Sequence, residues 1–300
     1  MDIGVIGVGK LGSIHARIYK EIYPQGNLWV CDVDEEKGRR IAQDFKANFV
    51  KDYRHLAGKV NAVSIATPTL SHFKIAEFFL KNSVCCLVEK PITTNIEQAN
   101  RLTRLAKKNK VFLMVGMVER FNSAYQKIKK IIRNPRFIEC HRLGPYPARS
   151  LDISVVLDLM IHDLDIILDL VGRKIKKVEG VGIKVLSKSC DIANVRINFQ
   201  GGGIANVTSS RVSDEKVRKI RIFFASSYIS LDYAQQQALI YQKKNNSIKK
   251  ETLKLTPYEP LKKEIEYFLD QINKKKFNYH IADRSIEALK LALKIEKIIQ

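Results

Sequence analysis

Residues 3–12 read Ile3-Gly-Val-Ile-Gly-Val-Gly-Lys-Leu-Gly12, and the part from Gly7 to Gly12 fits the pattern G-x-G-x-x-G. The apolar run 3–8 predicts a buried strand, and apolar residues at helical spacing from Leu11 to Ile22 predict that a helix follows. A glycine pattern between a strand and a helix is typical of a loop that binds a dinucleotide. The first glycine allows a tight turn, the second lets the backbone approach a pyrophosphate, and the third lets the helix pack closely. A glycine-rich turn without a ligand is the alternative.

An acidic residue follows at the distance that such a loop requires. Residues 28–33 read as the next strand, and Asp32 lies near its end, 20 residues after Gly12. A carboxylate in this place accepts hydrogen bonds from the ribose hydroxyls and repels a 2′-phosphate. Asp32 therefore favours NAD as the cofactor over NADP, with a cap at the end of the strand as the alternative role.

Two later strands also end in polar residues. Thr67-Pro68 follows the predicted strand 60–66, with His72 shortly after, and Glu89-Lys90-Pro91 follows the predicted strand 85–88. Because ligands of parallel sheets bind beyond the carboxyl ends of the strands, these residues are expected near the cofactor. The predicted cofactor-binding residues are Gly7, Gly9, Lys10, Leu11, Gly12, Asp32, Thr67, Pro68, His72 and Glu89. Lys90, which a proline fixes at a strand end, is the candidate for a functional cation.

Strands and helices alternate up to about residue 118, and the pattern then changes. The alternation predicts βαβ units and a doubly wound parallel sheet. After residue 118, strand-like segments follow one another with short turns, and two helices, at about 259–273 and 283–299, close the chain. Such segments predict a mostly antiparallel sheet with helices on one side. A chain of 300 residues is expected to form two domains, here an NAD-binding domain at 1–118 and a substrate-binding α+β domain at 119–300.

The charge of the chain is high but spread along its length. Lys and Arg number 52 against 31 Asp and Glu, which gives a net charge of +21. Solvated lysine-rich surfaces explain this better than a nucleic-acid site, because no helix-turn-helix or zinc-finger signature is present. No apolar run is long enough for a membrane helix, so neither nucleic acid nor membrane insertion is expected. The five cysteines form no C-x-x-C pair, and we expect a cytoplasmic protein without a metal ion.

Four motifs together resemble one known family. They are Gly7 to Gly12, Thr67-Pro68, Glu89-Lys90-Pro91 and Asp158-Leu-Met-Ile-His162-Asp163. Over essentially its whole length the chain resembles the family of glucose–fructose oxidoreductase, inositol dehydrogenase and rhizopine-catabolism proteins, called Gfo/Idh/MocA. The resemblance implies an N-terminal Rossmann domain followed by a domain with a large, mostly antiparallel sheet. That sheet commonly supports oligomers, so a homo-oligomer, either a dimer or a tetramer, is expected.

The same resemblance implies the catalytic residues. In the family, the lysine of the Glu-Lys-Pro motif and the aspartate and histidine of the later motif line the reacting carbon, which implies this role for Lys90, Asp158 and His162. Asp158 and His162 are four residues apart and would share one face of a helix. Oxidation of an alcohol requires a base for the hydroxyl proton, and histidine suits that task near neutral pH. His162 is therefore the expected base. Lys90 would orient and polarise the reacting oxygen, and Asp158 would bind the substrate or tune the pair.

A narrower resemblance points to the substrate. The segments 118–122, 142–149 and 155–163, together with Asp152, are similar to those of the bacterial UDP-N-acetylglucosamine 3-dehydrogenases of lipid A biosynthesis. Those enzymes oxidise the sugar 3-hydroxyl to a 3-keto nucleotide sugar, and arginine forks suit the diphosphate of such a substrate. The predicted substrate-binding residues are Arg120, Asn122, Arg142, Arg149 and Arg211. For each arginine, a structural ion pair is the open alternative.

Three functions are consistent with these patterns. The first is NAD-dependent oxidation of the 3-hydroxyl of a UDP-N-acetylhexosamine for lipid A or surface-glycan biosynthesis. The second is an inositol or free-sugar dehydrogenase of the same family. The third is a non-catalytic regulator that binds NAD, and the presence of Lys90, Asp158 and His162 argues against it.

Overall fold

The computed structural model describes residues 1–146, 153–245, 247–275 and 277–299. The chain forms two compact units, of which the first contains Met1–Met117 and Leu261–Ile286. The second contains Val118–Pro260 and Glu287–Gln300. Residues 261–286 follow the expected boundary at residue 118 in the chain, yet they belong to the first compact unit.

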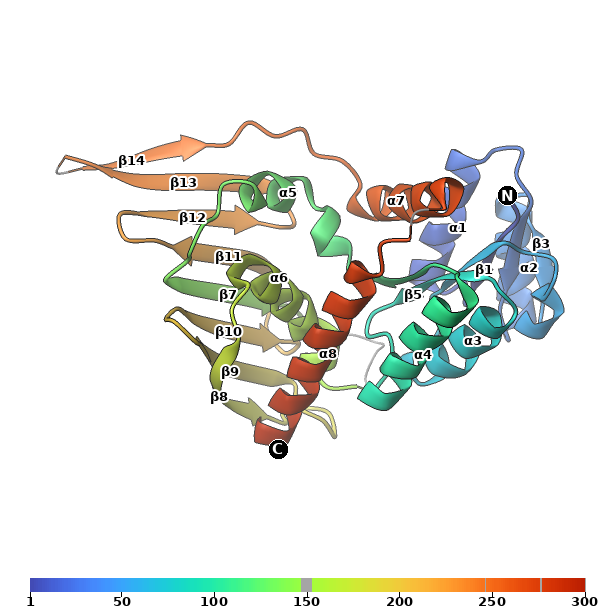
Figure 1. The fold of residues 1–300 in the computed structure, drawn as a ribbon, viewed down its shortest axis with the longest axis horizontal. Coiled ribbons are helices and arrows are strands. Elements are labelled where there is room, and N and C mark those ends of the chain that lie inside the picture. The colour runs from blue at the N-terminus through green and yellow to red at the C-terminus, as the bar shows by residue number, and fades with distance from the viewer. Residues whose placement is uncertain (147–152, 246, 276, 300) are drawn as a thin grey trace. The chain divides into compact units, whose positions relative to one another are not determined.

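The first unit is built on a six-stranded parallel sheet with the strand order β3-β2-β1-β4-β5-β6. Figure 1 labels β1, β3 and β5 of this sheet among its helices. The chain runs outward from β1 to β3 and then, in the opposite direction, from β4 to β6, as in doubly wound folds. Every residue of β1, β4 and β5 is buried, which is typical of a parallel sheet with helices on both faces. The strands are β1 (Ile3–Ile6), β2 (Leu28–Cys31), β3 (Asn48–Val50), β4 (Ala62–Ile65), β5 (Cys85–Glu89) and β6 (Leu113–Gly116).

Helices connect these strands and extend the core of the first unit. The side chain of Asp34 accepts a hydrogen bond from the Lys37 amide at the start of α2, and Asn95 caps α4 in the same way. Late in the chain, Phe268 of α7 stacks on Phe112 with ring centroids 5.8 Å apart, and both rings are fully buried. This aromatic contact explains why residues 261–286 belong to the first unit. The helices are α1 (Lys10–Ile22), α2 (Glu35–Asp44), α3 (Thr69–Lys81), α4 (Ile96–Asn109) and α7 (Pro260–Lys274), with a 3-10 turn at Tyr53–Leu56.

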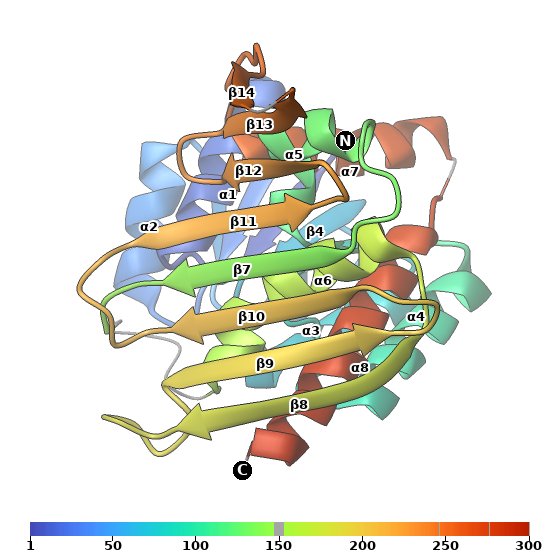
Figure 2. The same cartoon turned by 90° about the vertical axis from the view of Figure 1, so that its left-hand side faces the viewer.

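The second unit is built on an eight-stranded sheet with the order β14-β13-β12-β11-β7-β10-β9-β8 (Figure 2). Among the described strands of this unit, only β7 and β10 pair in parallel, and the other neighbours are antiparallel. The edge strand β14 is exposed throughout and carries Lys249 and Lys250, charges that discourage pairing with another chain. The strands are β7 (Phe137–Leu143), β8 (Ile175–Ile183), β9 (Ile192–Phe199), β10 (Ile204–Ser210), β11 (Val217–Phe223), β12 (Ser227–Asp232), β13 (Gln237–Lys244) and β14 (Ser247–Thr252).

One face of this sheet is covered by helices. Buried residues alternate along β7, where Ile138, Cys140 and Arg142 point to the covered face. The covering helices are α5 (Ser123–Lys129), α6 (Ile161–Val171) and the last part of α8 (His280–Ile299). Ile299 packs so closely on β8 that a Cβ added to Gly182 would lie 2.9 Å from it. In the described part of the unit, the opposite face carries no helix (Figure 2).

The fold class predicted from the sequence is confirmed: a doubly wound parallel sheet is followed by a mostly antiparallel sheet with helices. The sequence patterns did not predict the short strand β3 or the exposed strand β14. None of the helices in the described ranges is long and apolar enough to cross a membrane.

Candidate functional site

The loop between β1 and α1 needs glycine for both space and backbone conformation. Gly7 has a φ of +82°, and a Cβ there would lie 2.7 Å from Cγ2 of Thr67. A Cβ on Gly12 would lie 1.8 Å from the carbonyl oxygen of Gly7, so a side chain would force α1 away from the loop. At Gly9, by contrast, no described atom outside its chain neighbours lies within 4 Å of a Cβ position. The space beside Gly9 therefore fits a pyrophosphate.

The N-terminus of α1 can bind an anion. Gly9 is the N-cap, makes no side-chain cap, and is followed by a first turn without an acidic residue. In α2 and α4, the side chains of Asp34 and Asn95 accept hydrogen bonds from first-turn amides. The first-turn amides of α1, which include those of Lys10 and Leu11, are directed at the loop together with the positive end of the helix dipole. This arrangement is suited to phosphate groups.

Asp32 holds the glycine loop in place. Its Oδ2 accepts a hydrogen bond from the amide of Val8 at 2.8 Å, and its Oδ1 accepts one from the amide of Asp34 at 3.0 Å. The Lys37 ammonium lies 3.4 Å from Oδ2. The structure therefore shows the capping role that the sequence left as an alternative, and each carboxylate oxygen has a further lone pair for a ribose hydroxyl.

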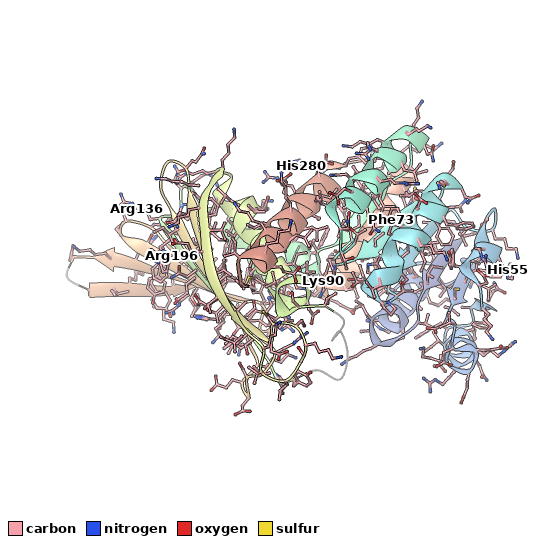
Figure 3. All side chains as sticks on the ribbon, turned by 90° about the horizontal axis from the view of Figure 1, so that it is seen from below. His55, Phe73, Lys90, Arg136, Arg196 and His280 are labelled. Carbon is pink, nitrogen blue, oxygen red and sulfur yellow. The ribbon has the colours of Figure 1, made fainter. Side chains whose placement is uncertain are left out.

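Glu89, the first residue of the Glu-Lys-Pro motif, is buried in a hydrogen-bond network with α1. His15 Nε2 lies 3.0 Å from Glu89 Oε1, and His15 Nδ1 lies 3.1 Å from Ser64 Oγ. The same Ser64 hydroxyl lies 2.7 Å from the hydroxyl of Tyr19, whose pKa is raised by burial. The network joins α1 to the end of β5, where half-buried Lys90 follows directly (Figure 3).

His72 is buried between two loops of the first unit. Its Nδ1 lies 2.9 Å from the carbonyl oxygen of Pro91, and its Nε2 lies 2.8 Å from that of Thr67. Burial lowers the pKa of His72, while the two carbonyl groups act in the opposite direction. The imidazole ties the loop after β4 to the loop after β5, so an effect of His72 on a cofactor would pass through these loops.

We expect His15→Leu to lower the free energy of unfolding by about 1–3 kcal/mol, because it removes the ring nitrogens that face buried Glu89 and Ser64. Denaturation by urea measures this loss. His55→Leu is the control, because His55 is exposed on the 3-10 turn (Figure 3) and its replacement should change the value by less than about 0.5 kcal/mol. Equal losses in the two variants would contradict a structural role for the network.

Asp158 and His162 lie in two consecutive helical turns of different kinds in the second unit. Half-buried Asp158 belongs to a π-helical turn, Val156–Met160, and His162 belongs to the first turn of α6, where it is 8% exposed. Short π-helical turns within α-helices are frequent at functional sites. The periodicity of the sequence predicts a regular helix here and gives no sign of this interruption.

Two of the predicted substrate arginines form buried ion pairs with α6. Arg142 of β7 donates to both oxygens of Asp163, at 2.9 and 3.0 Å, and to Glu119 at 2.9 Å. Arg120 donates to both oxygens of Asp165, at 2.6 and 2.5 Å. Bidentate pairing of this kind fixes the geometry of both partners. The sequence left a structural ion pair as the alternative for each arginine, and the structure shows such an ion pair for both.

The other predicted substrate-binding residues also have structural partners where they are described. Arg211 is 1% exposed and donates to Asp191 and to the carbonyl oxygen of Ile153, both at 2.9 Å. The side chain of Asn122 caps α5 and donates to the carbonyl oxygen of Tyr233 at 3.0 Å. Arg149 lies outside the described residues. The described polar contacts of Arg120, Asn122, Arg142 and Arg211 are with protein groups, and direct contacts of these residues with a substrate stay a prediction.

The sequence did not single out Arg218, which lies beside this cluster. It pairs in register with Arg142 across β11 and β7 and is half-buried. No motif marks it, because its position beside Arg142 depends on the pairing of two strands that are distant in the chain. The signal that was available is the spacing of Arg218, Ile220 and Ile222, which places the arginine on the apolar face of the strand.

Two family models match the chain. The "Oxidoreductase family, NAD-binding Rossmann fold" model matches residues 1–117, and the "GFO/IDH/MocA C-terminal domain" model matches residues 125–229. The chain belongs to the Gfo/Idh/MocA oxidoreductase family. It is an NAD-dependent dehydrogenase of a family that acts on sugar hydroxyls, and the resemblance inferred from the motifs is confirmed.

Individual members of the Gfo/Idh/MocA family show how far the similarity extends. UDP-N-acetylglucosamine 3-dehydrogenase of Acidithiobacillus ferrooxidans is 34% identical over 100% of this chain and 99% of that protein. A solved structure of that enzyme has a TM-score of 0.92 at 33% identity and covers 100% of this chain and 97% of the other. Myo-inositol 2-dehydrogenase of Thermotoga maritima is 26% identical over 80% of this chain and 78% of that protein. The scyllo-inositol dehydrogenase of Lactobacillus casei, solved with NAD(H) and scyllo-inositol, shares the fold with a TM-score of 0.83 at 18% identity, over 100% and 96% of the two chains.

Proposed function

We propose that this dehydrogenase oxidises the 3-hydroxyl of a UDP-N-acetylhexosamine to a 3-keto nucleotide sugar. The supporting observation is the similarity to UDP-N-acetylglucosamine 3-dehydrogenase of A. ferrooxidans, at 34% identity over 100% of this chain and 99% of that protein. The similarity to myo-inositol 2-dehydrogenase of T. maritima is lower in identity, 26%, and in coverage, 80% of this chain. An aminotransferase could convert the 3-keto group to an amine, so lipid A or another surface glycan is the proposed destination of the product.

The proposed reaction removes a hydride from carbon and a proton from oxygen. NAD, when bound, takes the hydride. We assign the proton to His162, because a neutral imidazole can accept it from the hydroxyl near neutral pH. The ammonium of Lys90 donates a hydrogen bond to the reacting oxygen and stabilises negative charge on it. Asp158 accepts a hydrogen bond from the substrate. The three assignments rest on the match to the Glu-Lys-Pro and Asp-x-x-x-His motifs.

We further propose a cytoplasmic homo-oligomer that uses NAD in preference to NADP. The helix-free face of the sheet in the described part of the second unit supports the oligomer. The preference for NAD rests on the position of Asp32 at the end of β2, beside the glycine loop.

We expect Asp32→Ser to raise the KM for NAD about 10-fold or more, because an acceptor for the ribose hydroxyls is lost. Since Asp32 also holds the amides of Val8 and Asp34, a looser loop could raise the same KM. The ratio of kcat/KM for NAD and NADP separates the two causes. A looser loop weakens both cofactors equally, whereas loss of the carboxylate that repels a 2′-phosphate shifts the ratio towards NADP. An unchanged ratio would leave Asp32 with the structural role alone.

A panel of substrates tests the proposed function. The protein is mixed with NAD and with UDP-N-acetylglucosamine, UDP-N-acetylgalactosamine, N-acetylglucosamine, glucose, myo-inositol or scyllo-inositol, and the formation of NADH is followed by absorbance. A sugar aminotransferase and its amino donor remove the keto product and draw the reaction forward. We expect NADH with a UDP-N-acetylhexosamine and a carbonyl at C3 in the product, which NMR identifies. No turnover of any UDP-sugar would exclude this substrate class.

Oxidation of an inositol is the second candidate. It is supported by relatives that are named as inositol dehydrogenases and are 26% to 30% identical over part of the chain. Formation of NADH with an inositol, together with no reaction of the UDP-sugars, would select this function.

A further inference from the structure

Arg218 is a half-buried arginine with no role in the chemistry proposed above. It lies near the start of β11 and faces Arg142 of β7 in register. Ile220 and Ile222 follow at intervals of two residues, share the face of Arg218, and are fully buried. The side chain of Arg218 therefore stands on the helix-covered face of the sheet, near the start of β11, and is half-buried there.

Arg142 has carboxylates close by that balance its charge, whereas the described residues offer none so close to Arg218. Arg142 has ion pairs with Asp163 and Glu119, both at 2.9 Å. Among the residues that the structure describes, no carboxylate lies within ion-pair distance of the Arg218 guanidinium. The pKa of Arg218 is lowered, first by burial and then by the charge of Arg142, although Glu119, Asp163 and Asp158 act in the opposite direction.

A partly desolvated cation without a close counter-charge is costly, and an anionic ligand would supply the missing counter-charge. The buried arginines Arg120, Arg142 and Arg211 each have a carboxylate partner in this unit. Arg218 differs from them because no ion pair with a carboxylate is found for it among the described residues. It also interacts electrostatically with Asp158, which we have assigned to the substrate. Arg218 is thus in the same part of the second unit as a proposed substrate residue.

We propose that Arg218 binds an anionic oxygen of the substrate and thereby selects nucleoside diphosphate sugars over uncharged sugars. The inference rests on the proposed function, because it names the group that recognises the diphosphate of that substrate. A guanidinium can donate two parallel hydrogen bonds to phosphate oxygens, and such charge-assisted bonds are strong in a partly dry site. The diphosphate would supply the counter-charge that Arg218 lacks.

The test uses UDP as the probe and protein saturated with NAD, so that UDP does not enter the cofactor site. Isothermal titration calorimetry measures the Kd for UDP. We expect Arg218→Gln to raise this Kd about 10- to 100-fold, the range for loss of a charge-assisted hydrogen bond. Arg218→Lys keeps the charge but loses the fork, so we expect an intermediate value. If Arg218→Gln fails to fold, the Lys variant alone carries the test.

Arg221→Gln is the matched control, because Arg221 lies on the same strand but is exposed and paired with Glu139. It should leave the Kd for UDP unchanged. An unchanged Kd in both Arg218 variants, or no binding of UDP by the unmodified protein, would overturn the inference.

Turnover separates this inference from the proposed function. If the protein oxidises UDP-N-acetylglucosamine and Arg218→Gln has the same KM, the inference is wrong and the proposed function stands. If UDP binding depends on Arg218 but no UDP-sugar is oxidised, the proposed function is wrong and the anion site stands.

Discussion

Replacement of Arg142 by methionine is expected to lower the free energy of unfolding by about 3–5 kcal/mol, the range for breaking a buried ion pair from one side. Arg142 is 1% exposed and is shared by Asp163 and Glu119. Methionine occupies a similar part of the core, but it leaves two carboxylates there without a counter-charge. Urea denaturation followed by circular dichroism measures the loss.

A matched control separates this ion pair from the general effect of removing an arginine. Arg221 lies on the neighbouring strand β11 and forms an exposed pair with Glu139, so Arg221→Met should cost about 0–1 kcal/mol. The variant that combines Arg142→Met with Asp163→Asn and Glu119→Gln should recover much of the loss, because it leaves no unpaired charge. If Arg142→Met cost no more than Arg221→Met, the ion pairs would not be what holds α6 on the sheet.

These ion pairs connect stability to the proposed chemistry. Asp163 directly follows His162 in the first turn of α6, and Arg142 fixes it against β7 from one side. Arg120 fixes Asp165, half a turn further along, from the 3-10 turn Val118–Phe121. The two arginines therefore hold the segment that carries His162, which makes them positioning residues for it.

The glycine loop and the two sheets could be predicted because local constraints determine them. At Gly7 and Gly12 a side chain would collide with the backbone, so only one residue type is compatible with the loop. In the same way, uninterrupted apolar runs such as β5 occur where a strand is buried on both faces, and the alternation in β7 occurs where one face is less covered. In each case the residues that carry the signal are close together in the chain.

The roles of the arginines could not be predicted, because a guanidinium suits a phosphate and a buried carboxylate equally well. The partner of Arg142 is 21 residues away in the chain, and that of Arg211 is 20 residues away. Only the folded chain shows that Asp163 and Asp191 occupy these positions. The same limit applies to Arg218, whose proximity to Arg142 depends on the pairing of β11 with β7. It also applies to α7, whose Phe268 and its partner Phe112 are separated by about half of the chain.

Lys90→Met and His162→Asn are each expected to lower kcat by about 10²- to 10⁴-fold, the range for loss of a group that moves or stabilises a proton. Lys90 follows β5 directly and His162 lies in the first turn of α6, and neither side chain is fully buried. Methionine keeps most of the length of lysine without its charge, and asparagine keeps a hydrogen-bonding group that cannot accept a proton near neutral pH. Binding of NAD, measured by calorimetry, should change little. Lys74→Met and His55→Asn are matched controls, because both residues are exposed in the first unit and should retain full activity.

The dependence of kcat on pH distinguishes the two assignments. In the unmodified protein kcat should fall towards acidic pH, because a protonated His162 cannot accept the hydroxyl proton. This fall in kcat, the acidic limb of the pH profile, should persist in Lys90→Met, where the base is intact. It should disappear from the residual activity of His162→Asn. If the acidic limb persisted in His162→Asn, another group would have to act as the base. Full activity in either variant would contradict the mechanism, while leaving the family assignment and the NAD-binding loop in place, since both rest on other residues.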